Sequence, residues 1–156
     1  MTHEGLTGKH TQTLDWKTHT QIRTGTCSLN PIENTAVVAE LIRNAKGSVE
    51  ILDVSTILPK MKYAPGHQTW KVMVEQDGNK IFENWNQVPK DNEKLQKGLA
   101  KSMFPPSPEE AKKLGLERSM RLLSHHNNTG SFYCCLLRKK RALPKSFHLS
   151  VRLYLL

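Results

Sequence analysis

The clearest helical pattern of apolar residues lies between Ser28 and Gly47. Apolar side chains recur there every three or four positions, which is typical of a helix with one buried face. Asn30 can cap the start, Pro31 suits the first helical position, and Gly47 is a natural stop. We therefore expect a surface helix that lies on a sheet. Its apolar face would consist of Val37, Val38, Leu41, Ile42 and Ala45.

Short runs with strand character follow the predicted helix. β-branched and aromatic residues with some alternation favour strands, and Asp77-Gly78 is typical of a hairpin turn between two of them. Phe132–Leu137 is a fully apolar run, which suits a buried position in a sheet. The other predicted strands are Ser48–Val54, Thr69–Glu75, Lys80–Trp85 and Met120–Leu123.

A second capped helix start occurs at Ser107-Pro108-Glu109-Glu110, and Gly115 ends it. Thr56–Gln68 and Val88–Pro106 contain prolines and few apolar residues, so both are predicted to be loops. His125–Gly130 is predicted to be a turn. Helices that alternate with strands indicate an α/β fold, although the strands are too few for a complete doubly wound sheet.

The two ends of the chain differ from its middle. Met1–Gly25 is polar and rich in Thr, without a clear period, and is predicted to be disordered or irregular. From Phe147 onward, apolar and polar residues alternate with the period of a strand, in a tail without a visible partner. We expect both ends to be flexible.

Charge narrows the classes of partner. The 156 residues are 37% hydrophobic and carry a formal charge of +9, as expected for one globular domain with a basic surface. Positive charge attracts polyanions such as nucleic acids or anionic membranes, but an inert basic surface is an equal alternative. No apolar run reaches the roughly 20 residues that span a bilayer. Three cysteines, two of them adjacent, form a poor disulfide framework, so we expect an intracellular protein.

Cys27 is the candidate nucleophile. It stands just before the predicted helix, and the positive end of a helix dipole stabilises a thiolate, which is the form that attacks. A small buried residue is the ordinary alternative for an intracellular cysteine. Cys134-Cys135 lie in the predicted apolar strand and are interpreted as buried filler.

Several segments resemble, in the same order, the nucleolar-protein/Sun family of RNA cytosine-5 methyltransferases. Thr26–Asn34 (TCSLNPIEN) resembles the nucleophile motif of that family. The following segments resemble its tRNA methyltransferase branch: Glu50–Ser55, Pro65-Gly66, Trp70–Met73, Met103–Pro106, Leu116–Arg118 and His125–Phe132. The chain is identified as a member of this family.

The resemblance implies a fold and a reaction. Residues 25–140 would be the C-terminal half of a Rossmann-like catalytic domain that uses S-adenosyl-L-methionine, flanked by an unmatched segment 1–24 and a tail 141–156. The family cysteine that matches Cys27 adds to the cytosine ring beside the carbon to be methylated. That carbon then takes the methyl group, and elimination of the cysteine releases 5-methylcytosine. The target base must leave its stack to reach the pocket.

Several features of the family are missing from this chain. There is no Gly-rich loop for the methyl donor, no counterpart of the acidic residue that holds its ribose, and no second cysteine after a proline. We therefore expect a fragment with the nucleophile motif, without cofactor-binding residues and inactive alone. Arg23 and Gly25 are also poor choices for the buried strand that precedes the family's nucleophile.

Other residues have two interpretations each. By resemblance, Arg121 and His125 are RNA contacts; His125-His126 could alternatively be ligands or bases, although no ligand set for a metal is evident. Trp70 and Trp85 could stack on bases, but such residues more often pack in a core. Arg138–Arg141 could grip phosphate or be a solvated chain end.

The function expected from the resemblance is RNA cytosine-5 methylation, with tRNA as the partner and a nuclear or nucleolar location. A non-catalytic RNA-binding remnant and an inert truncated product are the two alternatives. The first predicts salt-sensitive RNA binding that does not depend on Cys27, and the second predicts poor solubility and non-cooperative melting.

Overall fold

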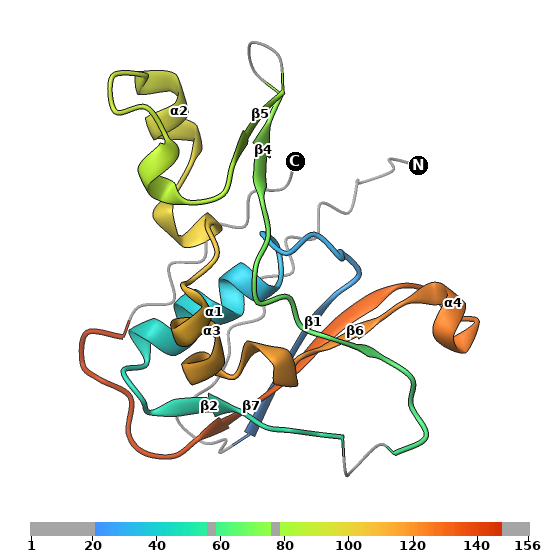
Figure 1. Ribbon diagram of the computed structural model, residues 1–156. Helices are drawn as coiled ribbons and strands as arrows, with labels where there is room; N and C mark the ends of the chain where they lie inside the picture. The colour runs from blue at the N-terminus through green and yellow to red at the C-terminus, as the bar shows by residue number, and fades with distance from the viewer. Residues whose placement is uncertain (1–20, 56–58, 76–78, 148–156) are drawn as a thin grey trace, which may run out of the picture.

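A computed structural model describes residues 21–55, 59–75 and 79–147, which form one sheet, a separate hairpin and the helices between them. The central strand of the sheet is β7 (Phe132–Lys139). β1 (Gln21–Thr26) pairs along one edge of β7, whereas β6 (Met120–Leu122) and β2 (Val49–Ile51) pair with successive parts of the other edge. All pairings among the described strands are antiparallel (Figure 1).

The apolar run that predicted β7 is buried mainly on one face. Tyr133, Cys135 and Leu137 alternate along the strand and are each at most 1% exposed, because they face the helices. Cys134 and Leu136 point to the other face and are only half-buried. The strand prediction is confirmed, and the alternation shows that the described helices cover a single face of this sheet.

β1 lies where the sequence predicted irregular chain, so that prediction was wrong for residues 21–25. Ile22 is its one buried side chain and packs in the core of the sheet. Gly25 leaves room for the ring of Phe132 on the neighbouring strand; a Cβ at Gly25 would lie 2.7 Å from that ring. Aromatic side chains commonly cover glycines in edge strands in this way. Arg23 is exposed, so no charge is buried.

Two helices cover the buried face of the sheet. α1 (Thr35–Asn44) and α3 (Pro108–Leu114) pack together with the 3-10 turn η3 (Leu116–Arg118) over β7. The second predicted helix is confirmed: Ser107 accepts a hydrogen bond from the Glu110 backbone, and Gly115 ends the helix in the left-handed conformation. The first predicted helix exists but begins at Thr35, not near Asn30.

A second, smaller core lies on the other side of α1. The strands β4 (Val72–Val74) and β5 (Lys80–Phe82) form an antiparallel hairpin, as predicted, and the Asp77-Gly78 turn lies outside the described residues. The 3-10 turns η1 (Trp85–Gln87) and η2 (Lys101–Met103) follow in sequence. The buried residues of this core are Ala36, Trp70, Val72, Phe82, Val88, Leu95 and Phe104.

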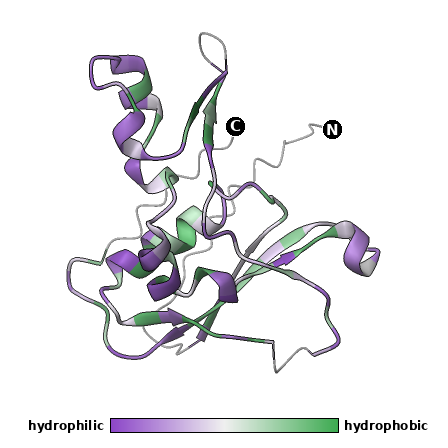
Figure 2. Ribbon diagram, viewed as in Figure 1, coloured by the Kyte–Doolittle hydropathy of each residue, from purple (hydrophilic) through white to green (hydrophobic). Residues whose placement is uncertain are grey.

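Two predicted loops contain short regular elements. α2 (Glu93–Gly98) interrupts the segment 88–106, and β3 (Ala64–Pro65) interrupts 56–68 and pairs with β6. The predicted turn after β6 contains the short helix α4 (Ser124–Asn127). Figure 2 shows hydrophilic residues over much of α2 and α4 and hydrophobic residues along β4 and β5. None of the described helices has the length and apolar character needed to cross a membrane. The predicted tail strand beyond residue 147 lies outside the described residues.

Candidate active site

Cys27 directly follows the last residue of β1, and its side chain is exposed. The expected proximity to a helix N-terminus was wrong, because α1 begins only at Thr35. The effect of a helix dipole falls off within the first turn, so α1 does not supply the activation predicted for the thiol. The position of Cys27 instead depends on the segment between β1 and α1.

That segment is held by hydrogen bonds from its own polar side chains. Thr26 Oγ1 accepts from the Ser28 backbone N–H at 3.1 Å, and Ser28 Oγ accepts from the Asn30 N–H at 3.1 Å. Asn30 Oδ1 then accepts from the Ile32 N–H at 3.1 Å. Such side-chain bonds to nearby N–H groups fix turns that have no helix or strand partners. The motif residues around Cys27 therefore fix its backbone and leave the thiol at the surface.

Asn34 joins this segment to α1. It is 2% exposed, and its Nδ2 donates to the Ser28 carbonyl at 3.1 Å. Its Oδ1 accepts from the Thr35 hydroxyl at 2.9 Å and from the Thr35 backbone N–H. Asn34, rather than Asn30, is thus the cap of α1. Because its amide is buried and bonded on both sides, Asn34 is the residue that couples the loop of Cys27 to the core.

Replacing Asn34 with alanine is expected to lower the free energy of unfolding by about 2 kcal/mol, because buried partners lose their hydrogen bonds. Urea titration followed by circular dichroism measures this change. Asn44→Ala is the control, since Asn44 is half-buried and makes one weak side-chain bond, to Glu40 at 3.4 Å. Equal destabilisation by the two variants would contradict the role of Asn34.

The sheet brings the predicted RNA contacts to the same end as Cys27. Tyr133 pairs with Thr26 on one side and with Arg121 on the other. Neighbouring strands are about 4.8 Å apart, so the backbones of Thr26 and Arg121 are about 10 Å apart. His125 is exposed in α4, which follows β6 at this end of the sheet (Figure 1). The three residues predicted from the sequence therefore lie toward the same end of the sheet, although they come from different elements.

The guanidinium of Arg121 already has protein partners. Its Nε donates to the Pro65 carbonyl at 2.7 Å, and its Nη1 lies 2.7 Å from Nε2 of His67. Guanidinium groups only donate, so Nε2 of His67 must be the unprotonated nitrogen of the ring. Burial, together with the positive charge of Arg121, lowers the pKa of His67 below 6.5. The contact of Arg121 with RNA stays a prediction, and sequence reasoning missed His67.

Stability is expected to fall as the pH drops below about 6.5, the pKa of His67 in the unfolded chain. The unfolded state gains this proton at a higher pH than the folded state, so the contribution is complete above that value and is lost below it. Urea midpoints at pH 7.5 and pH 5.5 measure the loss in wild type and in His67→Gln. The loss should be smaller in His67→Gln; a wild-type loss retained in His67→Gln would contradict the assignment.

The other cysteines differ from Cys27. Cys135 is 1% exposed, and burial raises the pKa of its thiol, as expected for inert filler. Cys134 is half-buried, and its pKa is also raised by burial, although nearby Arg23 acts in the opposite direction. Cys27 is thus the one exposed cysteine in the described part of the chain.

The two tryptophans have different environments. Trp70 is 7% exposed, and its indole N–H donates to the Met103 carbonyl at 2.7 Å, which confirms the packing interpretation. Trp85 is half-buried and meets Phe104 edge to face, with 5.6 Å between ring centroids. The basic run Arg138–Arg141 makes intramolecular contacts. Arg138 and Lys140 form ion pairs with Glu50, and Arg141 donates a hydrogen bond to the Lys46 carbonyl.

The described residues do not offer a site for S-adenosyl-L-methionine. Ligands of open α/β sheets bind at the carboxyl ends of parallel strands, beside a glycine-rich turn. The described sheet has only antiparallel pairs, and no glycine-rich strand-to-helix turn occurs in it. Nor do any three or more His, Cys, Asp or Glu side chains in residues 21–55, 59–75 and 79–147 form a group that could hold a metal ion.

Comparison with known proteins identifies relatives over most of the chain. It is 39% identical to the tRNA (cytosine(34)-C(5))-methyltransferase of Drosophila melanogaster over 118 residues, which are 76% of this chain and 15% of that enzyme. It is 41% identical to a multisite-specific tRNA (cytosine-C5) methyltransferase of Schizosaccharomyces pombe over 114 residues, 73% of this chain and 16% of that enzyme.

A multisite-specific tRNA (cytosine-C5) methyltransferase of Saccharomyces cerevisiae is 36% identical over 114 residues, again 73% of this chain and 15% of the enzyme. The chain therefore spans about one sixth of the length of these curated relatives. No protein-family profile and no solved structure matches it. Over about three quarters of its length, this chain corresponds to one segment of the tRNA cytosine-C5 methyltransferases and belongs to their family.

Proposed function

We propose that this chain is the segment of an RNA cytosine-5 methyltransferase that carries the nucleophile, and that Cys27 is this nucleophile. The observation that carries the proposal is the placement of Cys27. Its thiol is exposed at the end of β1, on a backbone fixed by hydrogen bonds from Thr26, Ser28 and Asn30. A nucleophile that must reach a base needs this combination of exposure and fixed position.

The proposed chemistry of this chain is addition to the cytosine ring. The Cys27 thiolate forms a bond to C6, and the electrons of the C5–C6 double bond move to C5, which becomes nucleophilic. In water, C5 can take a proton; loss of the original C5 hydrogen and departure of the thiolate then restore the ring. The cysteine is regenerated, and the net result is exchange of the C5 hydrogen with solvent.

Methylation requires S-adenosyl-L-methionine, which supplies the methyl group when bound. The described residues do not fit this group, so we assign no residue of this chain to it. We propose that residues 25–140 form the C-terminal part of a Rossmann-like domain, and that the donor site belongs to the portion of the relatives that this chain does not span. The substrate that the relatives' names suggest is tRNA, and a nuclear or nucleolar location is proposed by family resemblance alone.

Exchange of the C5 hydrogen tests the proposal without a methyl donor. A tRNA transcript with tritium at C5 of its cytidines is incubated with the chain, and tritium released into water is counted. Release above the rate without protein is expected. A chain that binds the RNA, by a separate gel-shift measurement, and releases no tritium would contradict the catalytic proposal. That outcome would favour the RNA-binding remnant, which the lack of a donor site among the described residues also allows.

A further inference from the structure

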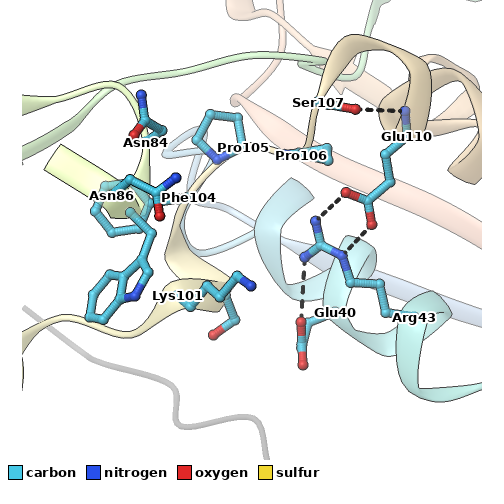
Figure 3. Close-up of a pocket in the computed structure, with 12 residues that line it drawn as sticks. Glu40, Arg43, Asn84, Asn86, Lys101, Phe104, Pro105, Pro106, Ser107 and Glu110 are labelled. Atoms are coloured by element: carbon cyan, nitrogen blue, oxygen red, sulfur yellow. Dashed lines mark hydrogen bonds and ion pairs between the residues drawn. The ribbon is translucent and has the colours of Figure 1, made fainter. Parts of the chain in front are cut away.

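A cleft of about 760 Å³ lies along the second half of α1, where Glu40 and Arg43 line it. Its walls come from the second half of α1, the turn after β5, η2 and the start of α3 (Figure 3). Cys27 does not line it, and the residues that do are separated in sequence by up to 70 positions. The cleft is therefore a second concave surface, distinct from the loop of the nucleophile.

One wall of the cleft consists of charged side chains that hydrogen bonds hold in place. Arg43 on α1 donates to both carboxylate oxygens of Glu110 on α3, at 2.8 and 3.2 Å, and to Glu40 at 3.4 Å. In Figure 3 its guanidinium lies between the two carboxylates. The Arg43 side chain lowers the pKa of Glu110, so the network stays ionised at neutral pH. One guanidinium and two carboxylates leave this wall with a net charge of −1, so an anionic group would have to bind at the opposite wall.

The other wall combines an aromatic ring with side-chain amides. Trp85 is half-buried and held edge to face against the buried Phe104, which fixes its position. Asn84 and Asn86 flank it in sequence and are exposed, and each amide can both donate and accept. Lys101 is exposed on η2 at the same cleft. A fixed aromatic surface, amides and a cation are the groups that bind a base and its phosphate.

We propose that this cleft binds one unpaired nucleotide of an RNA, with the base against Trp85, its edge on the Asn84 or Asn86 amide, and the phosphate on Lys101. The proposal rests on the RNA substrate proposed above and adds a second contact to it. The net charge of +9 brings the polyanion to the surface. A nucleotide held here is an anchor and not the target cytosine, because Cys27 precedes α1 and does not line the cleft, which lies along the second half of that helix.

A matched pair of charge reversals tests the cleft. Lys101→Glu and Lys94→Glu change the net charge equally, but Lys94 lies exposed on α2 and does not line the cleft. A short unstructured RNA of alternating cytidine and adenosine, labelled with fluorescein, is titrated with each protein by fluorescence anisotropy. Lys101→Glu should weaken RNA binding by about tenfold, because one charge-assisted contact with the phosphate is lost. Lys94→Glu should weaken RNA binding by clearly less. Equal weakening by the two variants would overturn the proposal.

Tryptophan fluorescence adds a readout that charge alone does not change. RNA should quench the emission of the wild-type chain, and the quenching should be mostly lost in Trp85→Phe, a variant that keeps an aromatic ring against Phe104. Unchanged quenching in Trp85→Phe would overturn the stacking assignment. Displacement of the RNA by S-adenosyl-L-methionine would also overturn it, because the cleft would then take a different ligand.

These outcomes separate the cleft from the proposed catalytic role. If the wild-type chain releases tritium and Lys101→Glu and Lys94→Glu have the same RNA affinity, the cleft proposal is wrong and the catalytic proposal stands. Selective weakening by Lys101→Glu without any tritium release would support the cleft and contradict the catalytic proposal. If the wild-type chain binds no RNA at all, both proposals are wrong.

Discussion

Replacing Cys27 with alanine is expected to reduce tritium release from C5-labelled tRNA to the rate measured without protein. Exchange at C5 requires a covalent bond to C6, and alanine has no group that can form it. The RNA affinity of the variant should be unchanged, because the exposed thiol supplies little binding energy. Tritium counting and gel shifts on the same preparation measure both quantities.

Cys134→Ala is the matched control for this experiment. Cys134 is half-buried on β7, and burial raises the pKa of its thiol, so it should not supply the attacking thiolate. Its replacement should leave tritium release unchanged. Tritium release that persists in Cys27→Ala but disappears in Cys134→Ala would identify Cys134 as the nucleophile and contradict the proposal.

Gly66→Ala is expected to destabilise the fold by about 3 kcal/mol, the upper range for overpacking a close contact. A Cβ at Gly66 would lie less than 3.0 Å from Ser119 Oγ and from the Leu116 carbonyl oxygen. The Leu116 carbonyl belongs to backbone, and Ser119 is fully buried with its hydroxyl bonded to that same carbonyl at 2.8 Å. Neither neighbour can move cheaply, and the Gly66 N–H bond to the Ser119 carbonyl, 2.9 Å, would be strained.

Gly98→Ala provides the comparison at a site with open space. No atom lies within 4 Å of a Cβ built at Gly98, which is the last residue of α2. Alanine favours helix over glycine by about 0.5 to 1 kcal/mol, so a small stabilisation is expected. Urea titration of both variants checks the pair. Similar stability changes in Gly66→Ala and Gly98→Ala would contradict the packing around Gly66.

Local patterns predicted the elements whose apolar residues are regularly spaced. β7 was recognised from six consecutive apolar residues, and α3 from a capping sequence that forms as expected. The start of α1 was misplaced because both Asn30 and Asn34 can cap a helix. Asn30 bonds to the turn before α1, and Asn34 alone meets Thr35. Sequence reasoning has no means of choosing between two such residues without the packing of the neighbouring segment.

β1 and α2 were missed because each has a single buried apolar residue. Ile22 is the one buried side chain of β1, so there is no alternation to recognise, and pairing with β7 stabilises the strand instead. α2 buries only Leu95; its signals were the Asn92 cap and the pair of Glu93 with Lys97, four residues apart. The cap stabilises a helix by about 1 kcal/mol and the charged pair by a few tenths, and both signals are common in loops as well.

The candidate site was found through resemblance and not through local physics. The helix-dipole argument for Cys27 was wrong, whereas the motif around Cys27 has a local physical reason in its hydrogen bonds. The contact of His67 with Arg121 joins residues 54 positions apart, and the cleft joins four segments. Long-range juxtapositions of this kind depend on strand pairing and helix packing, which the order of residues does not reveal directly.

Mass spectrometry of cytidine from tRNA incubated with the chain in deuterated water, with and without S-adenosyl-L-methionine, tests whether Cys27 attacks the base. We expect deuterium at C5 in both samples, dependence of this exchange on Cys27, and no 5-methylcytosine in either. Absence of deuterium from RNA that the folded chain binds would contradict the assignment of Cys27 as the nucleophile. Formation of 5-methylcytosine would contradict the proposal that the donor site lies outside the segment that this chain spans.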